Sequence, residues 1–116
     1  TEFYLTKAEA LARQNKDAEA QQVLFDLNTV RDENYVKSTK TGQALIDEIL
    51  LYRRIELWGE GVTSFDIARL GIGLNRQDGR ENLVIPGGDI VVAPLDSKMI
   101  FEIPQREIDG NPNINN

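Results

Sequence analysis

Two stripes of apolar side chains open the sequence, each with the three- and four-residue spacing of an amphipathic helix. The first lies between Glu2 and Gln14, at Tyr4, Leu5, Ala8, Leu11 and Ala12. The second follows a polar break in which Asp17 is the expected N-cap, and its members are Ala20, Val23, Leu24, Leu27 and Val30. Two helices joined by so short a turn form an αα-hairpin, so residues 1–31 resemble one tetratricopeptide-type unit. Such a unit buries its apolar face only against neighbours, and no second copy follows in the sequence.

The middle of the chain predicts a loop and two further helices. Residues 32–42 are polar and predict a loop, from which Tyr35 and Val36 can reach the core. A third helix is expected from residue 41 or 42 to about residue 59. Its apolar side chains cover more than one face, which predicts the most buried element. Glycines at 59 and 61 then favour a tight turn before a short fourth helix over residues 62–70.

Glycine and proline interrupt the remainder of the chain. All four prolines and six of the nine glycines lie beyond residue 70, which excludes long helices there. Short extended segments are expected at most at residues 83–85, 90–93 and 99–103, and the stretch either packs along the helices or is flexible. The predicted fold class is all-α. It comprises the tetratricopeptide-like hairpin over residues 1–31, two further helices within residues 41–70, and a long irregular carboxy-terminal segment over residues 71–116.

Composition restricts the chemistry that the chain can perform. Its 116 residues form one domain at most, or a piece of a larger one. The absence of Cys and His excludes thiol nucleophiles, histidine-based triads and the usual zinc and iron sites. These classes of site are therefore excluded within the chain. The sequence has 13 Lys and Arg and 19 Asp and Glu, so its net charge is −6. This negative charge argues against binding of nucleic acid or anionic lipid.

The sequence also lacks an obvious membrane or targeting segment. It contains no apolar window of the roughly 20 residues that cross a bilayer. Its first residues resemble neither a signal peptide nor an initiator-methionine end. This predicts a trimmed fragment whose targeting segment lay upstream.

Charged and large apolar residues alternate over residues 53–69, where the charged positions of interest are Arg53, Arg54, Glu56, Glu60, Asp66 and Arg69. On one helix Arg53, Glu56 and Glu60 share a face, and Asp66 lies three residues before Arg69. We interpret the six as a partly buried structural ion-pair network that fixes the angle between the third and fourth helices. The alternative is a two-carboxylate glycosidase centre formed by Glu56 and Glu60. The adjacent arginines argue against it, because cations favour ionised carboxylates and remove the proton donor.

Three further patterns have simple structural explanations. Gly71 and Gly73 match the start of a dinucleotide-binding fingerprint, but Arg76 takes the third glycine position and the segment follows a helix. Alternating Asp and Asn over residues 109–115 is similar to the start of an EF-hand loop, without its glycine or its final glutamate. Tyr35 is the best candidate for an exposed aromatic that stacks on a sugar ring, and packing explains it equally well.

Three segments together resemble the carboxy-terminal part of the SusD/RagB family, the cell-surface glycan-binding lipoproteins of Bacteroidetes. Residues 4–31 are similar to the family's last tetratricopeptide-like helix pair. The segment RRIELWGEG at residues 53–61, continued by FDI and RLG, resembles its arginine pair, Glu-Leu, Glu-Gly and aromatic-Asp pattern. Residues 101–113 are similar to its terminal Ile-Pro, Glu-Ile and Asn-Pro signature. Tyr52, Thr63 and Ser64 depart from the residues that are common in the family.

The resemblance implies an outer-membrane, surface-exposed protein that captures oligosaccharides and passes them to a SusC-like TonB-dependent transporter, without catalysis. Together with the composition, it leads us to expect no catalytic residue, no cofactor and no metal in this chain. This chain would then be mainly scaffold, and a lipid anchor upstream of it would be its only attachment to the membrane. Glycan-contacting residues of the family come from other regions, so the resemblance identifies no glycan-binding residue here. An intracellular helical-repeat module that binds a peptide stays open as the alternative.

Overall fold

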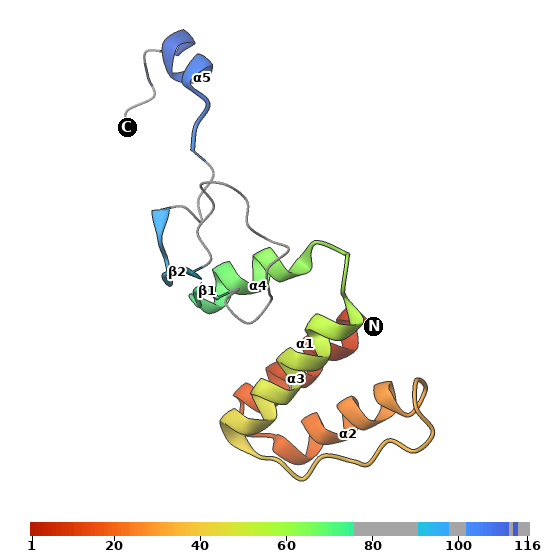
Figure 1. Ribbon diagram of the computed structural model, residues 1–116. Coiled ribbons are helices and arrows are strands. Elements are labelled where there is room, and N and C mark those ends of the chain that lie inside the picture. The colour runs from red at the N-terminus through yellow and green to blue at the C-terminus, as the bar shows by residue number, and fades with distance from the viewer. Residues whose placement is uncertain (76–90, 98–101, 112, 114–116) are drawn as a thin grey trace. The chain divides into compact units, whose positions relative to one another are not determined.

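A computed structural model describes residues 1–75, 91–97, 102–111 and 113 (Figure 1). The chain divides into two compact units, Thr1–Thr63 and Ser64–Asn116. The helices are α1 (Glu2–Arg13), α2 (Asp17–Asn28), α3 (Gly42–Glu56), α4 (Val62–Leu70) and α5 (Gln105–Gly110), and the strands are β1 (Leu74–Asn75) and β2 (Val91–Val92). The described chain is mostly helical, so the all-α prediction is confirmed.

Helix α1 is the central element of the first unit, because it packs against both α2 and α3. Its inward face carries Leu5, Ala8 and Ala12, which are almost completely buried. The two alanines allow a close approach of the neighbouring helices, and the larger core side chains of α2 and α3 fill the space around them. The remaining members of this core are Ala20, Val23, Leu24, Leu45, Ile46 and Ile49. The hairpin predicted over residues 1–31 is therefore present as α1 and α2, and α3 completes its core.

The turn between α1 and α2 differs in one detail from the prediction. Asn15 adopts a left-handed conformation with φ of 60°, as expected for a residue that ends a helix. Lys16 is the N-cap of α2, and Asp17 is the first helical residue, so the N-cap prediction for Asp17 is wrong by one position. The Asp17 carboxylate Oδ2 instead accepts a hydrogen bond from the Gly42 backbone N–H at 3.1 Å. Asp17 thus satisfies a donor at the start of α3, and it links the two helices.

The segment after α2 runs back along that helix to reach α3 (Figure 1). Polar contacts hold it in place: the Gln21 side chain donates to the Lys40 carbonyl at 2.8 Å, and the Ser38 hydroxyl donates to the Glu48 carboxylate. Val36, which was expected to reach the core, is 82% exposed. The loop is therefore ordered by hydrogen bonds to both flanking helices more than by apolar burial.

Tyr35 forms an aromatic cluster with Phe25 of α2 and Tyr52 of α3. Its ring centroid lies 6.1 Å from that of Phe25 and 5.8 Å from that of Tyr52, the second contact being edge-to-face. The Tyr35 hydroxyl is buried beside the Asn28 and Tyr52 side chains. Of the two interpretations of Tyr35, packing is the one that the structure supports. The ring is not available as an open stacking platform.

Helix α3 is shorter and more exposed than predicted. It ends at Glu56 instead of near residue 59, and Gly59 and Gly61 have φ of 83° and 75°, values that favour glycine. One side of α3 contributes buried residues to the core, whereas Leu51 and Ile55 are 54% and 57% exposed. The expectation that α3 is the most buried element is therefore wrong for its outer side, because its packing partner in the first unit, α1, covers only the inner side.

The second unit contains a small antiparallel pairing of β1 with β2, in which Leu74 faces Val92 and Asn75 faces Val91. Strand β2 falls within the extended segment expected at residues 90–93, whereas β1 was not expected. Gly73 is required here, because a Cβ atom at this position would collide with the Val92 carbonyl oxygen. The expected segment at residues 83–85 and the first three residues of the one expected at 99–103 lie outside the described residues, and residues 102 and 103 are not in a strand.

Helix α5 was not expected from the sequence, since Pro104 precedes it, its last residue is Gly110, and Pro112 follows. Pro104 is its N-cap, and its carbonyl accepts a hydrogen bond from the Glu107 N–H at 2.8 Å. Proline is compatible with a helix start because its missing N–H would have no intrahelical partner there. A helix of six residues can thus form in a part of the chain where glycine and proline prevent longer helices.

We predict that Tyr35 makes the first unit less stable as the pH rises above 10. Burial of its hydroxyl raises the pKa of Tyr35 from 10.0 to about 12, Tyr52 and Glu48 add to the rise, and Asn28 opposes it. Because the folded state holds this proton more tightly, the stabilising contribution is complete below pH 10 and is lost as the pH rises toward 12. Urea denaturation of the natural chain and of Tyr35→Phe between pH 8 and pH 11 should show a shallower alkaline decline for the variant. At pH 8 the two should agree within about 1 to 2 kcal/mol, since phenylalanine keeps the ring packing and loses only the contacts of the hydroxyl with Asn28 and Tyr52. Parallel pH profiles would contradict this role for Tyr35.

Candidate functional site

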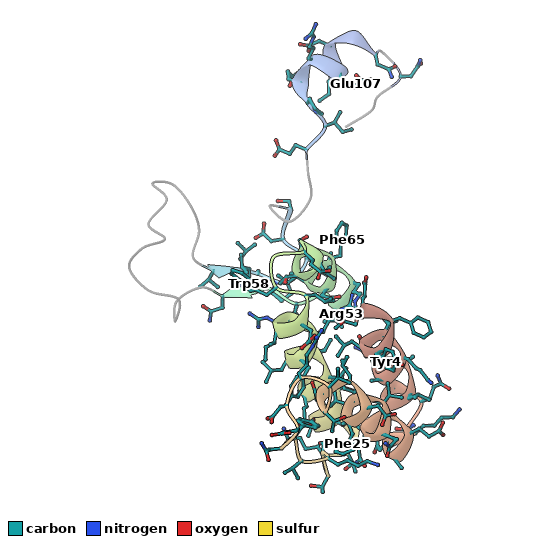
Figure 2. All side chains as sticks on the ribbon, turned by 90° about the vertical axis from the view of Figure 1, so that its right-hand side faces the viewer. Tyr4, Phe25, Arg53, Trp58, Phe65 and Glu107 are labelled. Carbon is teal, nitrogen blue, oxygen red and sulfur yellow. The ribbon has the colours of Figure 1, made fainter. Side chains whose placement is uncertain are left out.

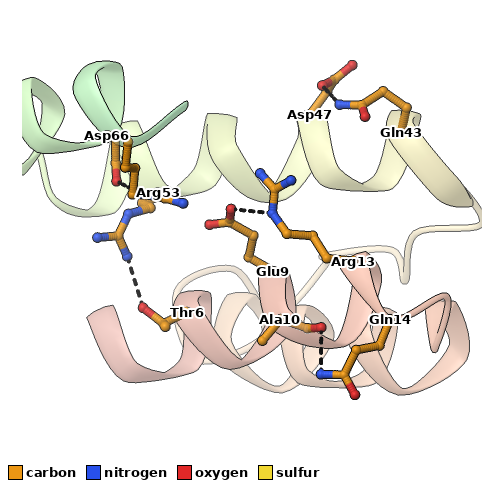
Figure 3. Close-up of polar contacts among 10 residues, drawn as sticks. Thr6, Glu9, Ala10, Arg13, Gln14, Gln43, Asp47, Arg53 and Asp66 are labelled. Carbon is orange, nitrogen blue, oxygen red and sulfur yellow. Dashed lines mark hydrogen bonds and ion pairs between the residues drawn. The ribbon is translucent and has the colours of Figure 1, made fainter. Parts of the chain in front are cut away.

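The charged segment at the end of α3 was the strongest candidate site, and Arg53 is its buried member. Only 8% of the Arg53 side chain is exposed. Its Nη1 atom donates to the Thr6 hydroxyl at 3.2 Å (Figure 3). Its Nη2 atom donates to the Glu2 carboxylate at 3.0 Å. Both partners belong to α1. A buried guanidinium needs such hydrogen bonds, because an unpaired charge in the protein interior is strongly destabilising. Arg53 therefore joins the last turns of α3 to the first turns of α1.

Glu56 makes a second connection between elements distant in sequence. Its side chain is only 14% exposed, and its Oε2 atom accepts hydrogen bonds from Arg31 Nε at 3.3 Å and Nη2 at 3.2 Å. Arg31 lies just after α2, and its Nη2 atom also donates to the Thr1 hydroxyl at 3.4 Å. Glu56 thus ties the end of α3 to the segment that follows α2. Neither Arg31 nor Glu2 was among the residues predicted for the network.

The remaining four residues of the predicted set lie in different surroundings. In the second unit, the Asp66 carboxylate accepts from Arg69 Nε at 2.8 Å, with the (i, i+3) spacing that was expected. Arg54 and Glu60 are exposed side chains of the first unit. Each unit thus holds ion pairs of its own, around Arg53 and Glu56 in the first and at Asp66 and Arg69 in the second. A single network across all six residues stays a prediction.

Glu56 and Glu60 do not share a helix face. The spacing argument required a helix through residue 60, whereas α3 ends at Glu56 and Glu60 lies between two glycines with positive φ. Glu56 is engaged with Arg31, and Glu60 is exposed. A glycosidase needs two carboxyl groups on opposite sides of one sugar-binding cleft. The observed contacts of Glu56 fit a structural ion pair better than half of such a centre.

An open groove lies on the outer side of α3, and the sequence did not predict it. Its volume is about 470 Å³, and it is lined by Leu51, Arg54, Ile55, Trp58 and Thr63. Trp58 is 86% exposed (Figure 2), although its apolar spacing suggested a core position. Periodicity identifies apolar faces, but it does not reveal whether a given face is covered within the chain. We call Leu51, Arg54, Ile55 and Trp58 the α3 outer face.

A second, smaller groove of about 220 Å³ lies where α1 begins and α2 ends. Its lining includes Tyr4, Leu27, Val30 and Arg31. Phe3 and Val30, both 78% exposed, lie at the same end of the two helices. The sequence placed Tyr4 and Val30 in the apolar stripes of the hairpin. The apolar stripes of α1 and α2 therefore include residues that the core of the first unit does not bury.

The weaker motifs have structural explanations. Gly71 has φ of 60° and follows the last residue of α4, and Gly73 gives space to β2, so neither glycine points to a nucleotide. In the 109–115 pattern, Asp109 accepts a hydrogen bond from Gln105, and the Asn111 side chain accepts from the Asn113 N–H. No cluster of three or more acidic, histidine or cysteine side chains occurs among the described residues that could hold a metal. None of the helices that the structure describes is long and apolar enough to cross a membrane.

We predict that the burial of Arg53 has a measurable energetic effect. Arg53→Met should lower the free energy of unfolding by about 1 to 3 kcal/mol, because it removes two charge-assisted hydrogen bonds from a buried position. Arg54→Met is the matched control, since it changes the same residue type at an exposed neighbouring position and should alter stability by about 0.5 kcal/mol or less. Urea denaturation at neutral pH measures both. Equal effects of the two substitutions would show that Arg53 has no special structural role.

Comparisons with known proteins agree with the sequence resemblance. A sequence model of the SusD family matches residues 1–116. Among solved structures, the crystal structure of a SusD-like carbohydrate binding protein from Bacteroides vulgatus ATCC 8482 is similar to this chain, with a TM-score of 0.74 and 29% sequence identity. The match covers 97% of this chain and 28% of that protein. A search of curated proteins found no match. Since the family model covers the whole sequence, the chain belongs to the SusD family.

Proposed function

We propose that this chain is the carboxy-terminal part of a SusD-like protein that captures oligosaccharides at the cell surface. The observation that carries the proposal is the family match over residues 1–116. The similarity to a SusD-like carbohydrate binding protein supports it. Because the chain spans 28% of that protein, glycan capture is proposed for the full-length protein and not for these residues alone.

Within that protein, the chain acts mainly as scaffold. The buried or nearly buried charges of the first unit connect helices: Arg53 joins α3 to α1, and Glu56 joins α3 to the segment after α2. Tyr35, the aromatic residue considered for sugar stacking, packs between Phe25 and Tyr52. These side chains stabilise the arrangement of the helices, and they leave glycan contacts to other parts of the protein.

The full-length protein binds without catalysis. Glu56 is held by Arg31, and Glu60 lies on an exposed glycine turn, so these two carboxyl groups are poorly arranged for a glycosidase. Capture followed by transfer requires only reversible binding. The receiving protein would be a SusC-like TonB-dependent transporter. The full-length protein would lie at the outer membrane, attached by a lipid anchor in a part of the protein outside this chain.

Calorimetric titration of the full-length protein with a panel of oligosaccharides tests the proposal. We expect saturable binding of at least one oligosaccharide and no release of reducing sugar. Glu56→Gln and Glu60→Gln should leave the affinity unchanged within about twofold, because these carboxylates are structural or exposed. Reducing sugar that is released by the natural protein and abolished in both variants would establish the glycosidase instead. Binding of peptides and of no glycan would favour the helical-repeat interaction module.

A further inference from the structure

The α3 outer face combines three large apolar side chains with one cation. Leu51 and Ile55 lie one helical turn apart, and Trp58 lies one turn further, just beyond the end of α3. Such a spacing forms one continuous stripe along the helix. All three side chains are more than half exposed, and together with Arg54 and Thr63 they line the groove of about 470 Å³. An exposed stripe of this kind marks an interaction surface.

The shape and chemistry of the groove favour a helix as its occupant. Ridges of side chains from one helix fit the grooves of another, and a stripe at this spacing is the surface that such packing uses. Arg54 lies within the stripe and makes no hydrogen bond or ion pair with the described part of the chain. When a covering helix removes the guanidinium from water, a carboxylate opposite Arg54 is needed to compensate its charge.

Chain length indicates where this helix comes from. The chain aligns over 97% of its length with only 28% of the SusD-like protein, so most of a protein of that size lies outside these residues. A helical-repeat unit buries its apolar faces only against neighbouring elements, and the first unit leaves the α3 outer face without one. A second copy of this chain fits less well, because a twofold contact through the same face would bring two Arg54 side chains together.

A sugar ring is also a poorer match for this groove. An exposed indole can stack on a sugar, but sugar sites need several hydrogen-bonding groups beside the aromatic platform. Beside Trp58 the groove offers two aliphatic side chains, one hydroxyl and one guanidinium. The lining therefore matches an apolar helix with one acidic residue better than it matches a carbohydrate.

From these observations we infer that the α3 outer face is the docking surface for an amphipathic, carboxylate-bearing helix of the full-length SusD-like protein, outside these 116 residues. The inference rests on the proposed function in one respect, since it requires the chain to be part of a longer protein of the SusD family. It goes beyond that function by naming the surface that joins the scaffold to the rest of the protein. In the assembled protein, Trp58 is then an interface residue and not a glycan platform.

Cysteine labelling tests the inference, because this chain contains no cysteine of its own. Ile55→Cys and Trp58→Cys are made in the 116-residue chain and in the full-length protein, where any other cysteines are replaced by serine. We expect maleimide labelling of both positions to be slower by about tenfold or more in the full-length protein, since a covered thiol reacts only during local opening. Glu19→Cys, at an exposed position of α2, is the control and should react equally in both. Leu51→Cys provides a further position if one variant fails to fold, as judged by circular dichroism.

Each other outcome overturns the inference in a recognisable way. Equal labelling of the α3 outer face in both proteins would contradict the inference: at the rate of the Glu19→Cys control it would show that nothing covers the face, and at a slower rate it would show that these 116 residues cover it themselves. Protection that requires added oligosaccharide would identify a sugar as the occupant. Protection in the 116-residue chain that grows with protein concentration would identify a second copy. Failure of the full-length protein to bind any glycan would contradict the proposed function, but it would leave the labelling result and this docking surface intact.

Discussion

The buried guanidinium of Arg53 is the interaction on which the arrangement of the first unit depends. A charge that is 8% exposed is tolerated only where hydrogen-bonding partners are fixed in position, and Arg53 donates to Glu2 and Thr6 of α1. The apolar core can hold α1 against α3 in several neighbouring registers, since apolar contacts are not directional. Two hydrogen bonds from one planar group are directional, and they select one register. Glu56 and Arg31 add a similar constraint on the segment that follows α2.

This constraint explains how a small unit can be ordered while two of its surfaces stay open. Its core consists of a few residues around α1, and three of these are alanines. Leu11, Leu27, Leu50 and Tyr52 pack partly buried against it, whereas the apolar side chains of the α3 outer face, and Phe3 and Val30 at the end of the hairpin, are more than half exposed. Polar contacts between the helices, and the loop that contains Tyr35, therefore help to specify how the helices are arranged. In a protein with a larger core, side-chain packing would do this. The same open surfaces are what a repeat unit needs in order to join its neighbours.

Sequence reasoning predicted the elements of the helical part well and the long-range contacts poorly. Periodicity located α1, α2 and α4 closely, because amphipathic spacing and glycine turns are local signals. It overestimated the length and burial of α3, since the apolar spacing from Leu51 to Trp58 has the same appearance whether or not another element covers it. The pairing of Arg53 with Glu2 was not predictable, because nothing local to either residue encodes a contact between positions 51 residues apart. Helix α5 was missed because proline, read there as a helix breaker, can equally begin a helix. The family could be identified from the sequence, because the order and spacing of three motif segments carry information that the apolar periodicity of one helix does not contain.

The most direct test of this account is a double-mutant cycle between Arg53 and Glu2. The free energies of unfolding of the natural chain, Arg53→Met, Glu2→Ala and the double variant are measured by urea denaturation at low and at high salt. The account predicts a coupling free energy of about 0.5 kcal/mol or more, which salt reduces but does not abolish, since the guanidinium is buried whereas the Glu2 side chain is 59% exposed. Strictly additive effects of the two substitutions would contradict the claim that this contact determines how α3 is placed on α1.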